Sequence, residues 1–441
     1  MKIYKLLIPT ILLLGNLMAT DTDLPKYYET TLDNGLQVVA IPMDNDTNVI
    51  TTDIFYKVGS RNETMGKSGI AHMLEHLNFK STKNLKAGEF DTIVKSFGGV
   101  NNASTGFDYT HYFIKSSSKN LSKSLGLFAE LMENLNLKDK EFQPERNVVA
   151  EERLWRTDNN PTGYLYFKLF NNTFAYHPYH WTPIGFMSDI KSWSITDIKQ
   201  FHKLYYAPNN AVVIVAGDID KDKVFKDAKK YFKDIKPSKN IPQSIHTIEP
   251  KQDGAKKIII HKESQVQIIA INFHIPNFQD KDQVALSALS ELLSSGKSSV
   301  LNELLIDQKQ LVNTIYAYNM ELKDPGVFMF LAVCNPGVDA QKVEKLIWQE
   351  IKKIQNGDIK KSIIEKIKNN TKADFIFSLE SSSSVASLYG SYLARGDIKP
   401  LLEYEQNIEK LKISDIITVA KKYLTKDNST TVILKQKEDK Q

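Results

Sequence analysis

One pattern occurs twice in this chain, once in each half. It runs from 195 to 216 and again from 413 to 434, and consists of a helical stretch followed by an apolar run. Thr196 and Ser414 stand where N-caps are expected, each followed by an Asp that favours a helix N-terminus. A unit that recurs within one chain predicts two domains built on the same plan.

Strand-like segments recur as well. Residues 36–56 and 256–274 are both rich in alternating or β-branched residues, and each leads into a helical stretch. Strand runs that stand beside separate long helices are typical of the α+β class. We therefore predict an α+β fold of two homologous domains, each a mainly antiparallel sheet with helices packed on one face.

A polar segment separates the two copies. Residues 237–254 contain prolines and polar residues without any periodicity, which predicts a linker. The flanking regions, 22–236 and 255–441, are each about 200 residues long, within the usual size of a domain.

Residues 1–19 have the layout of a secretory signal peptide. A short basic region precedes the apolar run 6–14, which is too short to span a bilayer comfortably, and Ala19 suits the position before a cleavage site. Leu17 fits the cleavage pattern poorly, so an uncleaved anchor is the alternative. We expect an exported protein, periplasmic or otherwise outside the cytoplasm, that contacts a membrane only if this segment is retained.

Charge and cysteine content exclude several classes of protein. The formal net charge is +5, and the 57 basic residues are spread along the chain, so we expect no nucleic-acid partner. Cys334 is the only cysteine, which excludes an internal disulfide and any zinc finger or iron–sulfur cluster built on cysteines. Any metal must therefore be held by histidines and carboxylates.

Such residues occur together in the segment Gly69–Leu77, which contains no proline and is predicted to be helical. His72 and His76 are four residues apart, so their imidazoles lie on one helix face and can bind one Zn²⁺. Glu75 lies beside them, placed to take a proton from a water. The alternative is a pair of structural histidines at a helix edge, and a third ligand would decide between the two.

A second acidic segment follows Pro144, a residue suited to the first position of a helix. Glu145 and Glu152 are seven residues, or two turns, apart and share a face of this predicted helix. By itself this pattern is more typical of a solvated acidic surface than of a metal site.

The HxxEH segment followed by this Glu resembles the pitrilysin/insulinase family of metallopeptidases, the inverzincins. Further segments resemble the same family, densely over residues 30–220 and thinly over 260–441. They are Asp33–Leu36, Gly98–Thr105, Asp108–Thr110, His177–Pro178, Gly185, Tyr206–Asn210 and Gly217–Asp218. The resemblance is best to the short branch related to mitochondrial processing peptidase.

The resemblance implies a zinc endopeptidase whose catalytic centre lies in the first domain. His72, His76 and Glu152 would bind one zinc ion per chain, Glu75 would be the general base, and Glu145 would orient a ligand. Peptides or unfolded polypeptides would bind in an internal chamber as an added strand along an edge formed by Asn102, Ala103, Ser104 and Thr105.

The second domain departs from the family pattern. Family members hold substrate with an Arg and a Tyr from this domain or from a partner, but Ile306 and Asn313 stand at the corresponding positions. No Arg lies between residues 157 and 394. We therefore expect a homologous partner subunit that supplies the Arg and the Tyr in a heterodimer. The alternative is a self-sufficient homodimer or monomer with weak activity. A non-catalytic structural or chaperone-like role is a further alternative.

Overall fold

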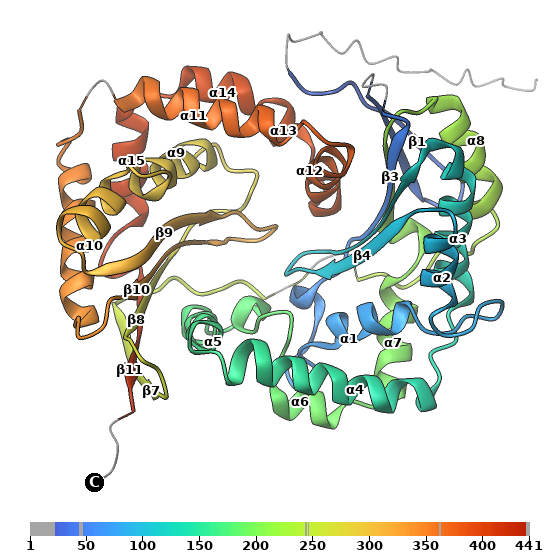
Figure 1. The fold of residues 1–441 in the computed structure, drawn as a ribbon, viewed down its shortest axis with the longest axis horizontal. Coiled ribbons are helices and arrows are strands. Elements are labelled where there is room, and N and C mark those ends of the chain that lie inside the picture. Colours follow the sequence, from blue (N-terminus) through green and yellow to red (C-terminus); the bar gives the residue numbers. More distant parts are fainter. Residues whose placement is uncertain (1–22, 44–46, 243–244, 246, 361–362, 438–441) are drawn as a thin grey trace, which may run out of the picture.

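The computed structural model describes residues 23–437, except 44–46, 243–244, 246 and 361–362 (Figure 1). The predicted signal peptide, residues 1–19, lies outside the described residues. Within the described part of the chain, no helix is long and apolar enough to cross a membrane.

The described chain forms two mixed sheets that share a five-strand topology, to which the first sheet adds β1. The first has the order β1-β2-β6-β3-β5-β4, and the second has the order β7-β11-β8-β10-β9. The strands of the first sheet are β1 (Tyr28–Thr31), β2 (Gln37–Pro42), β3 (Val49–Tyr56), β4 (Val100–Thr105), β5 (Thr110–Ser117) and β6 (Ala211–Gly217). Those of the second are β7 (Lys256–Lys262), β8 (Ile268–His274), β9 (Val312–Met320), β10 (Val327–Cys334) and β11 (Ser429–Gln436).

Strand by strand, β2-β6-β3-β5-β4 corresponds to β7-β11-β8-β10-β9. In each sheet one pair is parallel, β2 with β6 and β7 with β11, and the other pairs are antiparallel. The prediction of two homologous α+β domains with mainly antiparallel sheets is therefore confirmed. In the sequence, the strands of one sheet precede residues 237–254 and those of the other follow them. The described part of this segment contains no helix or strand. The exact domain boundaries stay predictions.

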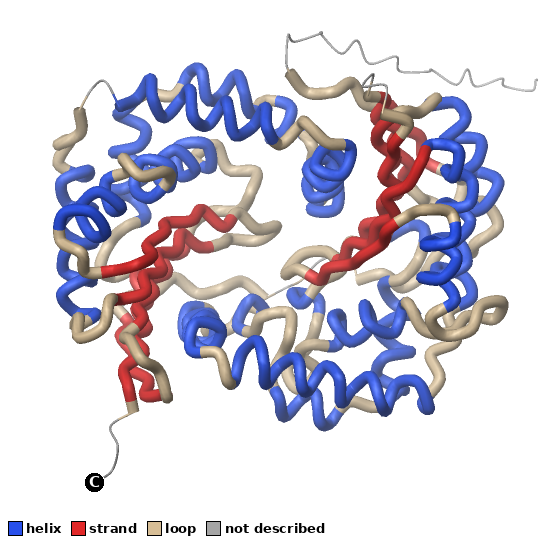
Figure 2. The backbone as a smooth tube through the Cα atoms, viewed as in Figure 1, coloured by secondary structure: helices blue, strands red, loops and turns tan. Residues whose placement is uncertain are grey.

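Helices cover the outward face of each sheet (Figures 1 and 2). The helices of the first half are α1 (Ile70–Asn78), α2 (Glu89–Ser96), α3 (Leu121–Asn134), α4 (Asp139–Arg153), α5 (Pro161–Thr173), α6 (Met187–Ser192), α7 (Ile195–Tyr205) and α8 (Lys221–Phe232). Those of the second half are α9 (Gln283–Ser294), α10 (Ala340–Gln355), α11 (Ile363–Phe377), α12 (Ser382–Arg395), α13 (Lys399–Leu402), α14 (Tyr404–Lys410) and α15 (Ile413–Tyr423). Short helical turns used below are η1 (Ser60–Asn62), η3 (Leu154–Asp158), η4 (Pro178–His180) and η6 (Asn302–Gln308).

The two halves exchange one helix each across the middle of the molecule. Helix α12, from the second half, packs its buried side chains Val385, Ala386 and Tyr389 against Phe55 and Ile214 on the inner face of the first sheet. Helix α5, from the first half, packs on β8 and β11 of the second sheet through residues that include Leu165 and Leu169. The sequence predicts helices on one face of each sheet. The structure shows that the opposite face of each sheet is also covered, by a helix that belongs to the other half of the chain.

Helix starts differ from their predicted positions. Helix α7 is capped by Ser194 and not by Thr196, since Ser194 and Asp197 exchange hydrogen bonds in a capping box. In the repeat, the N–H of Lys412 donates to Asp415 at the start of α15, so Ser414 is not the cap either. Both predicted caps lie two residues too far along the chain, because the Asp at the third helical position makes the capping contact.

Candidate metal centre

Helix α1 turns one polar face toward a cavity lined by residues of the first half. Gly69 precedes it in the left-handed conformation (φ +85°), where a side chain would be strained. The apolar face of the helix, including Ile70, Met73 and Leu74, is buried in the first core. His72, Glu75 and His76 consequently point away from that core.

Helix α4 brings the second set of carboxylates alongside. It begins at Asp139, so Pro144 lies inside the helix and not at its first position as predicted. Phe142, in the first turns of the helix, is fully buried in the first core and anchors this earlier start. Glu145 and Glu152 lie on the face turned to α1, and the chain continues past Arg153 as the π-helical turn η3.

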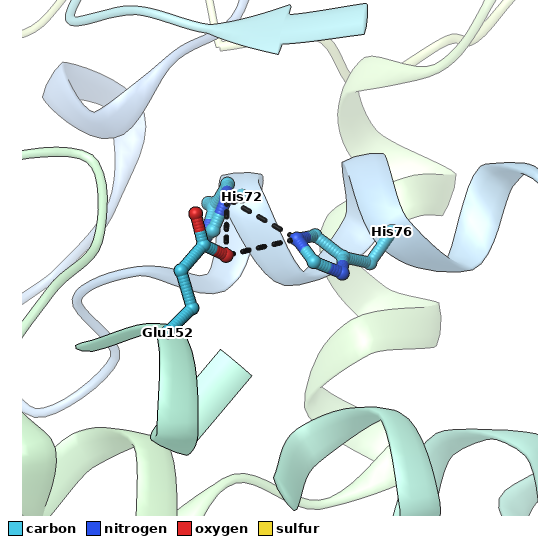
Figure 3. Close-up of side chains that lie close together, drawn as sticks. All are labelled: His72, His76 and Glu152. Atoms are coloured by element: carbon cyan, nitrogen blue, oxygen red, sulfur yellow. Dashed lines mark hydrogen bonds and ion pairs between the residues drawn. The ribbon is translucent and has the colours of Figure 1, made fainter. Parts of the chain in front are cut away.

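Three ligand atoms converge on one point between α1 and α4 (Figure 3). The Nε2 atoms of His72 and His76 are 3.3 Å apart, and Oε2 of Glu152 lies 3.6 Å from the first and 3.4 Å from the second. Ligands held at about 2.0–2.1 Å by a tetrahedral zinc ion lie about 3.3 Å from one another. The spacing and the donor set therefore fit one zinc ion, and all three residues line the same cavity.

The protonation of these ligands follows from their surroundings. Burial, together with the neighbouring His76, lowers the pKa of His72 to about 4. Burial also disfavours a charged His76, but its contacts with Glu145 and Glu152 outweigh this and raise its pKa to about 9. The hydrogen bond with His76 lowers the pKa of Glu152. Near neutral pH the triad thus combines a carboxylate with one neutral imidazole and a second that readily holds a proton.

Two ligands are held by neighbouring side chains. Glu145 accepts a hydrogen bond at 2.9 Å from Nδ1 of His76, and its other oxygen lies 2.6 Å from Nζ of Lys80. Nε of Arg156, in η3, lies 3.0 Å from Oε1 of Glu152, the oxygen turned away from the histidines. Buried Nδ1 of His72 has no hydrogen-bond partner among the described residues.

Sequence reasoning missed Lys80 and Arg156. Arg156 is four residues after Glu152, the spacing at which helical side chains meet, so this spacing could have identified Arg156. Lys80 follows the end of α1 and contacts Glu145 on another helix, which no local spacing indicates.

Glu75 lies beside the triad and is held by a strand. Its Oε2 accepts a hydrogen bond of 2.5 Å from the hydroxyl of Thr105, the last residue of β4. Burial raises the pKa of Glu75 above its usual value, against the opposing effect of this bond. A carboxylate with a raised pKa is a better proton acceptor near neutral pH.

The predicted substrate-binding residues lie on the free edge of the first sheet. Strand β4 pairs with β5 on one side only, so its other edge carries backbone groups that no described strand satisfies. Asn102 and Ser104 are exposed on one face of this strand, whereas Ala103 and Thr105 lie on the face toward α1. Together with the triad, Glu75 and Glu145, these four residues line one cavity of about 1010 Å³.

Ile306 and Asn313, which stand where family members have an Arg and a Tyr, are not among the residues that line this cavity. Ile306, in η6, packs against the core of the second half. Asn313 is exposed near the start of β9, and Tyr316 and Tyr318, on the same strand, are also exposed. Arg395, the first arginine after the gap in the sequence, is buried at the end of α12 and donates to the carbonyl oxygen of Glu321.

Comparisons with known proteins match both halves of the chain. The model of a family described as insulinase (peptidase family M16) matches residues 38–180, and that of the peptidase M16 inactive domain matches residues 192–371. A zinc protease, PqqE, from Helicobacter pylori is 56% identical over 425 residues, which cover 96% of each chain. A probable mitochondrial-processing peptidase subunit beta from Arabidopsis thaliana is 24% identical over 91% of this chain and 76% of that protein.

Solved structures show the same fold. The crystal structure of a protease from Helicobacter pylori, 56% identical, covers 93% of this chain and 100% of its own with a TM-score of 0.92. The periplasmic protease PqqL from Escherichia coli has a TM-score of 0.77 at 19% identity, covering 94% of this chain and 48% of that one. At that identity the second likeness concerns the fold alone.

Proposed function

The chain belongs to the insulinase family of zinc proteases, peptidase family M16, and we propose that it is an endopeptidase of the HxxEH type that hydrolyses peptides or unfolded polypeptides. The observation that carries this proposal is the triangle of ligand atoms from His72, His76 and Glu152 with Glu75 in the same cavity. A carboxylate beside an open metal position is the arrangement that metal-assisted hydrolysis needs.

His72, His76 and Glu152 would hold one zinc ion per chain, which when bound lowers the pKa of a water and polarises a carbonyl group. Glu75 accepts the proton of the attacking water and then delivers it to the nitrogen of the leaving amine. Thr105 holds Oε2 of Glu75, which leaves Oε1 to carry that proton. Glu145, itself held by Lys80, keeps the His76 ring oriented through Nδ1.

Substrate would bind as an added strand along β4, from Asn102 to Thr105. Backbone hydrogen bonds along a sheet edge hold an extended chain with limited dependence on its sequence. Ala103 and Thr105 lie on the face toward α1, which supports delivery of the scissile bond to Glu75. A peptide or an unfolded segment can adopt this extended form, which supports the substrate class.

A homologous partner subunit is part of the proposal. The cavity around the triad is lined by residues of the first half, and Ile306, at the position of the missing Arg, is packed into a core. A partner that supplies an Arg and a Tyr would form a heterodimer, with a homodimer as the alternative. The relative from Arabidopsis is itself named a subunit, which supports this expectation. Assays of the chain alone and with a homologous subunit test it: full activity alone would remove the need for a partner.

Export to the periplasm is proposed from residues 1–19. Fractionation of cells with an antibody against the chain, and determination of the N-terminal residue of the mature protein, test both the location and the cleavage. Mature protein that begins at Met1 in a membrane fraction would favour the anchor.

The non-catalytic alternative has one observation in its favour. A subunit of the cytochrome b-c1 complex from Rattus norvegicus is 25% identical over 94% of this chain, so proteins of this form also occur in respiratory complexes. Protein that contains no zinc after purification at neutral pH would support that reading.

Glu75→Gln tests the assignment of the base. Glutamine keeps the size of the side chain and its contact with Thr105 but cannot accept the proton, so zinc content should be unchanged while hydrolysis falls by at least about 100-fold. The measurements are metal analysis and cleavage of a fluorogenic unstructured peptide. Glu151→Gln is the matched control, since Glu151 is exposed and adjacent to a ligand; unchanged activity in Glu75→Gln would contradict the mechanism.

A further inference from the structure

The turn between β9 and β10 reaches from the second half into the first. Leu322 of this turn and Val327, the first residue of β10, are buried in an apolar cluster with Phe107, Phe170 and Phe174 of the first half. The backbone of the second half is thereby fixed close to the β4–β5 turn, at the end of the strand that carries Thr105.

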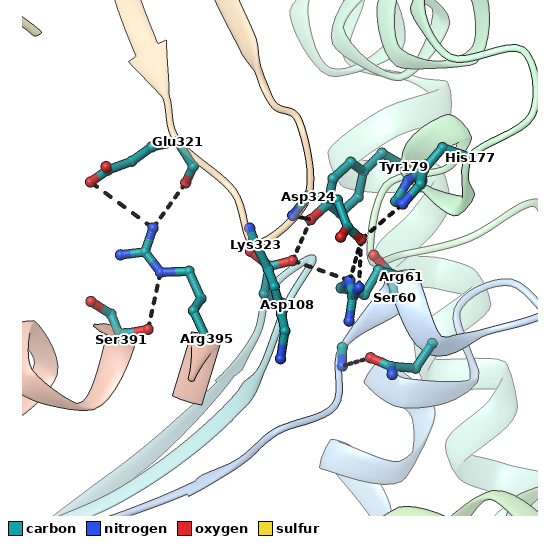
Figure 4. Close-up of polar contacts among 12 residues, drawn as sticks. Ser60, Arg61, Asp108, His177, Tyr179, Glu321, Lys323, Asp324, Ser391 and Arg395 are labelled. Atoms are coloured by element: carbon teal, nitrogen blue, oxygen red, sulfur yellow. Dashed lines mark hydrogen bonds and ion pairs between the residues drawn. The ribbon is translucent and has the colours of Figure 1, made fainter. Parts of the chain in front are cut away.

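A polar network whose first-half residues are buried joins the halves beside this cluster (Figure 4). Oδ2 of Asp324, in the β9–β10 turn, accepts hydrogen bonds from Nε of Arg61 at 3.0 Å and from Nε2 of His177 at 2.9 Å. Nδ1 of His177 accepts from the N–H of Tyr179 at 3.1 Å, so Nε2 carries the proton that reaches Asp324.

The network continues to the β4–β5 turn. The Tyr179 hydroxyl donates to Asp108 at 2.5 Å and accepts from the N–H of Asp324 at 3.1 Å, and the N–H of Lys323 donates to Asp108 at 2.8 Å. We call Arg61, Asp108, His177, Tyr179 and Asp324 the interdomain clasp. The side chains of Arg61, Asp108 and His177 are less than 10% exposed and that of Asp324 is 30% exposed, so water competes for these contacts only from the Asp324 side.

Hydrogen bonds connect the interdomain clasp to α1, the helix that carries two of the proposed zinc ligands. Arg61 lies in η1, and Glu63, two residues later, accepts hydrogen bonds of 2.8 Å from the N–H groups of Gly69 and Ala71. These donors open α1, the helix of His72, Glu75 and His76. Glu63 is buried and also accepts from Nε1 of Trp181, so it links η1 firmly to the start of the helix.

A second set of hydrogen bonds connects the interdomain clasp to the end of β4, the strand that carries Thr105. The N–H groups of Ser60 and Arg61 donate to the carbonyl oxygens of Gly106 and Phe107 at 3.1 and 2.9 Å. Gly59 allows this approach, because a Cβ there would lie 2.5 Å from both carbonyl oxygens. Residue 106 directly follows Thr105, which holds Glu75.

We propose that Asp324 is a positioning residue for the metal centre, acting through Arg61 on α1 and on β4. The proposal rests on the proposed function, because it takes the triad to be a zinc site. The second half of the chain contributes none of the proposed metal ligands. Through Asp324 it would nevertheless help to position the metal centre of the same polypeptide. Asp324 touches neither the ligands nor Glu75; it holds the segments that carry them.

Asp324→Ala in the full chain tests this role. The change leaves Arg61 and His177 without their shared acceptor, so α1 should lose its fixed position. Zinc affinity, measured by competition with a chelator, should fall by about 10-fold or more, as is typical when supports of metal ligands are removed. In the metal-free protein, hydrogen exchange at the amides of Gly69 and Ala71 should speed up. The cobalt-substituted protein should show an altered visible spectrum, and kcat should fall more than KM rises.

Asp282→Ala is the matched control. Asp282 also belongs to the second half and also forms a close ion pair, at 2.7 Å with Lys422, but it lies outside the interdomain clasp. Its zinc affinity and cobalt spectrum should remain those of the unaltered chain. Tyr179→Phe is a second test variant, since it keeps the ring in the apolar cluster and removes only the hydroxyl; it should act in the same direction as Asp324→Ala.

Unaltered zinc affinity, cobalt spectrum and amide exchange in Asp324→Ala and Tyr179→Phe would overturn the proposal, as would equal effects in Asp282→Ala. These readouts are separate from the peptidase assignment. If Glu75→Gln retained hydrolysis while Asp324→Ala weakened zinc binding, the peptidase mechanism would fail and the positioning role would stand.

Discussion

At the scale of single residues, Glu145 shows how a carboxylate that is not a candidate ligand supports a histidine that is one. It accepts from Nδ1 of His76 and is held in turn by Lys80, so that when His76 releases a proton, Nδ1 keeps its own and Nε2 becomes available to a metal. Removal of such outer partners typically lowers metal affinity 10- to 100-fold, by the ~1.4–2.7 kcal/mol that these factors represent.

Glu145→Ala should therefore weaken zinc binding by about 10- to 100-fold without unfolding the chain. Chelator competition at neutral pH is the measurement, with circular dichroism as the check on folding. Glu151→Ala, a change of the same kind on the exposed side of α4, should leave zinc affinity unaltered; equal losses in both variants would contradict the role of Glu145.

His202 leads to a prediction about pH. Its Nε2 is buried without a hydrogen-bond partner among the described residues, and burial lowers the pKa of His202 to about 4. The unfolded chain, where a histidine has a pKa near 6.5, then binds more protons between pH 6.5 and 4, so stability falls as the pH drops through this window.

His202→Phe should flatten this part of the stability profile, by up to about 3 kcal/mol at pH 4. Urea unfolding at a series of pH values, compared with the unaltered chain, measures the effect. His261→Phe, at an exposed position on β7, should leave the profile as it is. Parallel profiles for His202→Phe and the unaltered chain would show that this histidine does not contribute.

The sequence predicts some of these residues and not others for a physical reason. His72, Glu75 and His76 lie on one helix, so their spacing alone places them together. Glu152 lies on another helix, and only the family resemblance selects it over an acidic surface. No local pattern pairs Asp324 with Arg61, since such a contact depends on how two domains meet.

At the scale of elements, the exchanged helix α12 depends on one small residue. Gly390 lies against the Phe55 ring of β3, where an added Cβ would collide with the ring. Helix glycine is normally unfavourable relative to alanine, by about 1 kcal/mol. Here it permits α12 to approach the inner face of the first sheet.

Gly390→Ala should destabilise the chain despite its better helix propensity, since overpacking typically costs about 1–3 kcal/mol. Denaturant unfolding is the measurement. Ser391→Ala, one residue further along α12, should be close to neutral. A more stable Gly390→Ala variant would mean that α12 does not pack closely on β3.

The repeated strands were predictable because the same apolar patterns occur in both halves, and the two sheets have the same topology. The exchange of α5 and α12 was not predictable. The apolar side chains of α12, such as Val385 and Tyr389, indicate that one face of the helix is buried but not which sheet buries it.

At the scale of the whole molecule, the exchange makes each half incomplete without the other. Fragments 22–236 and 255–441 should be insoluble when expressed separately, because each exposes a sheet face that a helix of the other half normally covers. Coexpressed, they should copurify as a one-to-one complex that persists at high salt, since the contact is mainly apolar. Size-exclusion chromatography with light scattering measures this; a stable, monomeric first fragment would contradict it.

The free edges of the two sheets have a consequence for solubility. An open strand edge invites pairing with other chains, and proteins usually blunt such edges with short strands or lysines. The outer edges follow this rule: β1 has only four residues, and β7 carries lysines 256, 257 and 262. The inner edges, β4 and β9, face the space between the halves (Figure 1). The proposed added strand would therefore occupy an edge that lysines do not blunt, since β4 carries none.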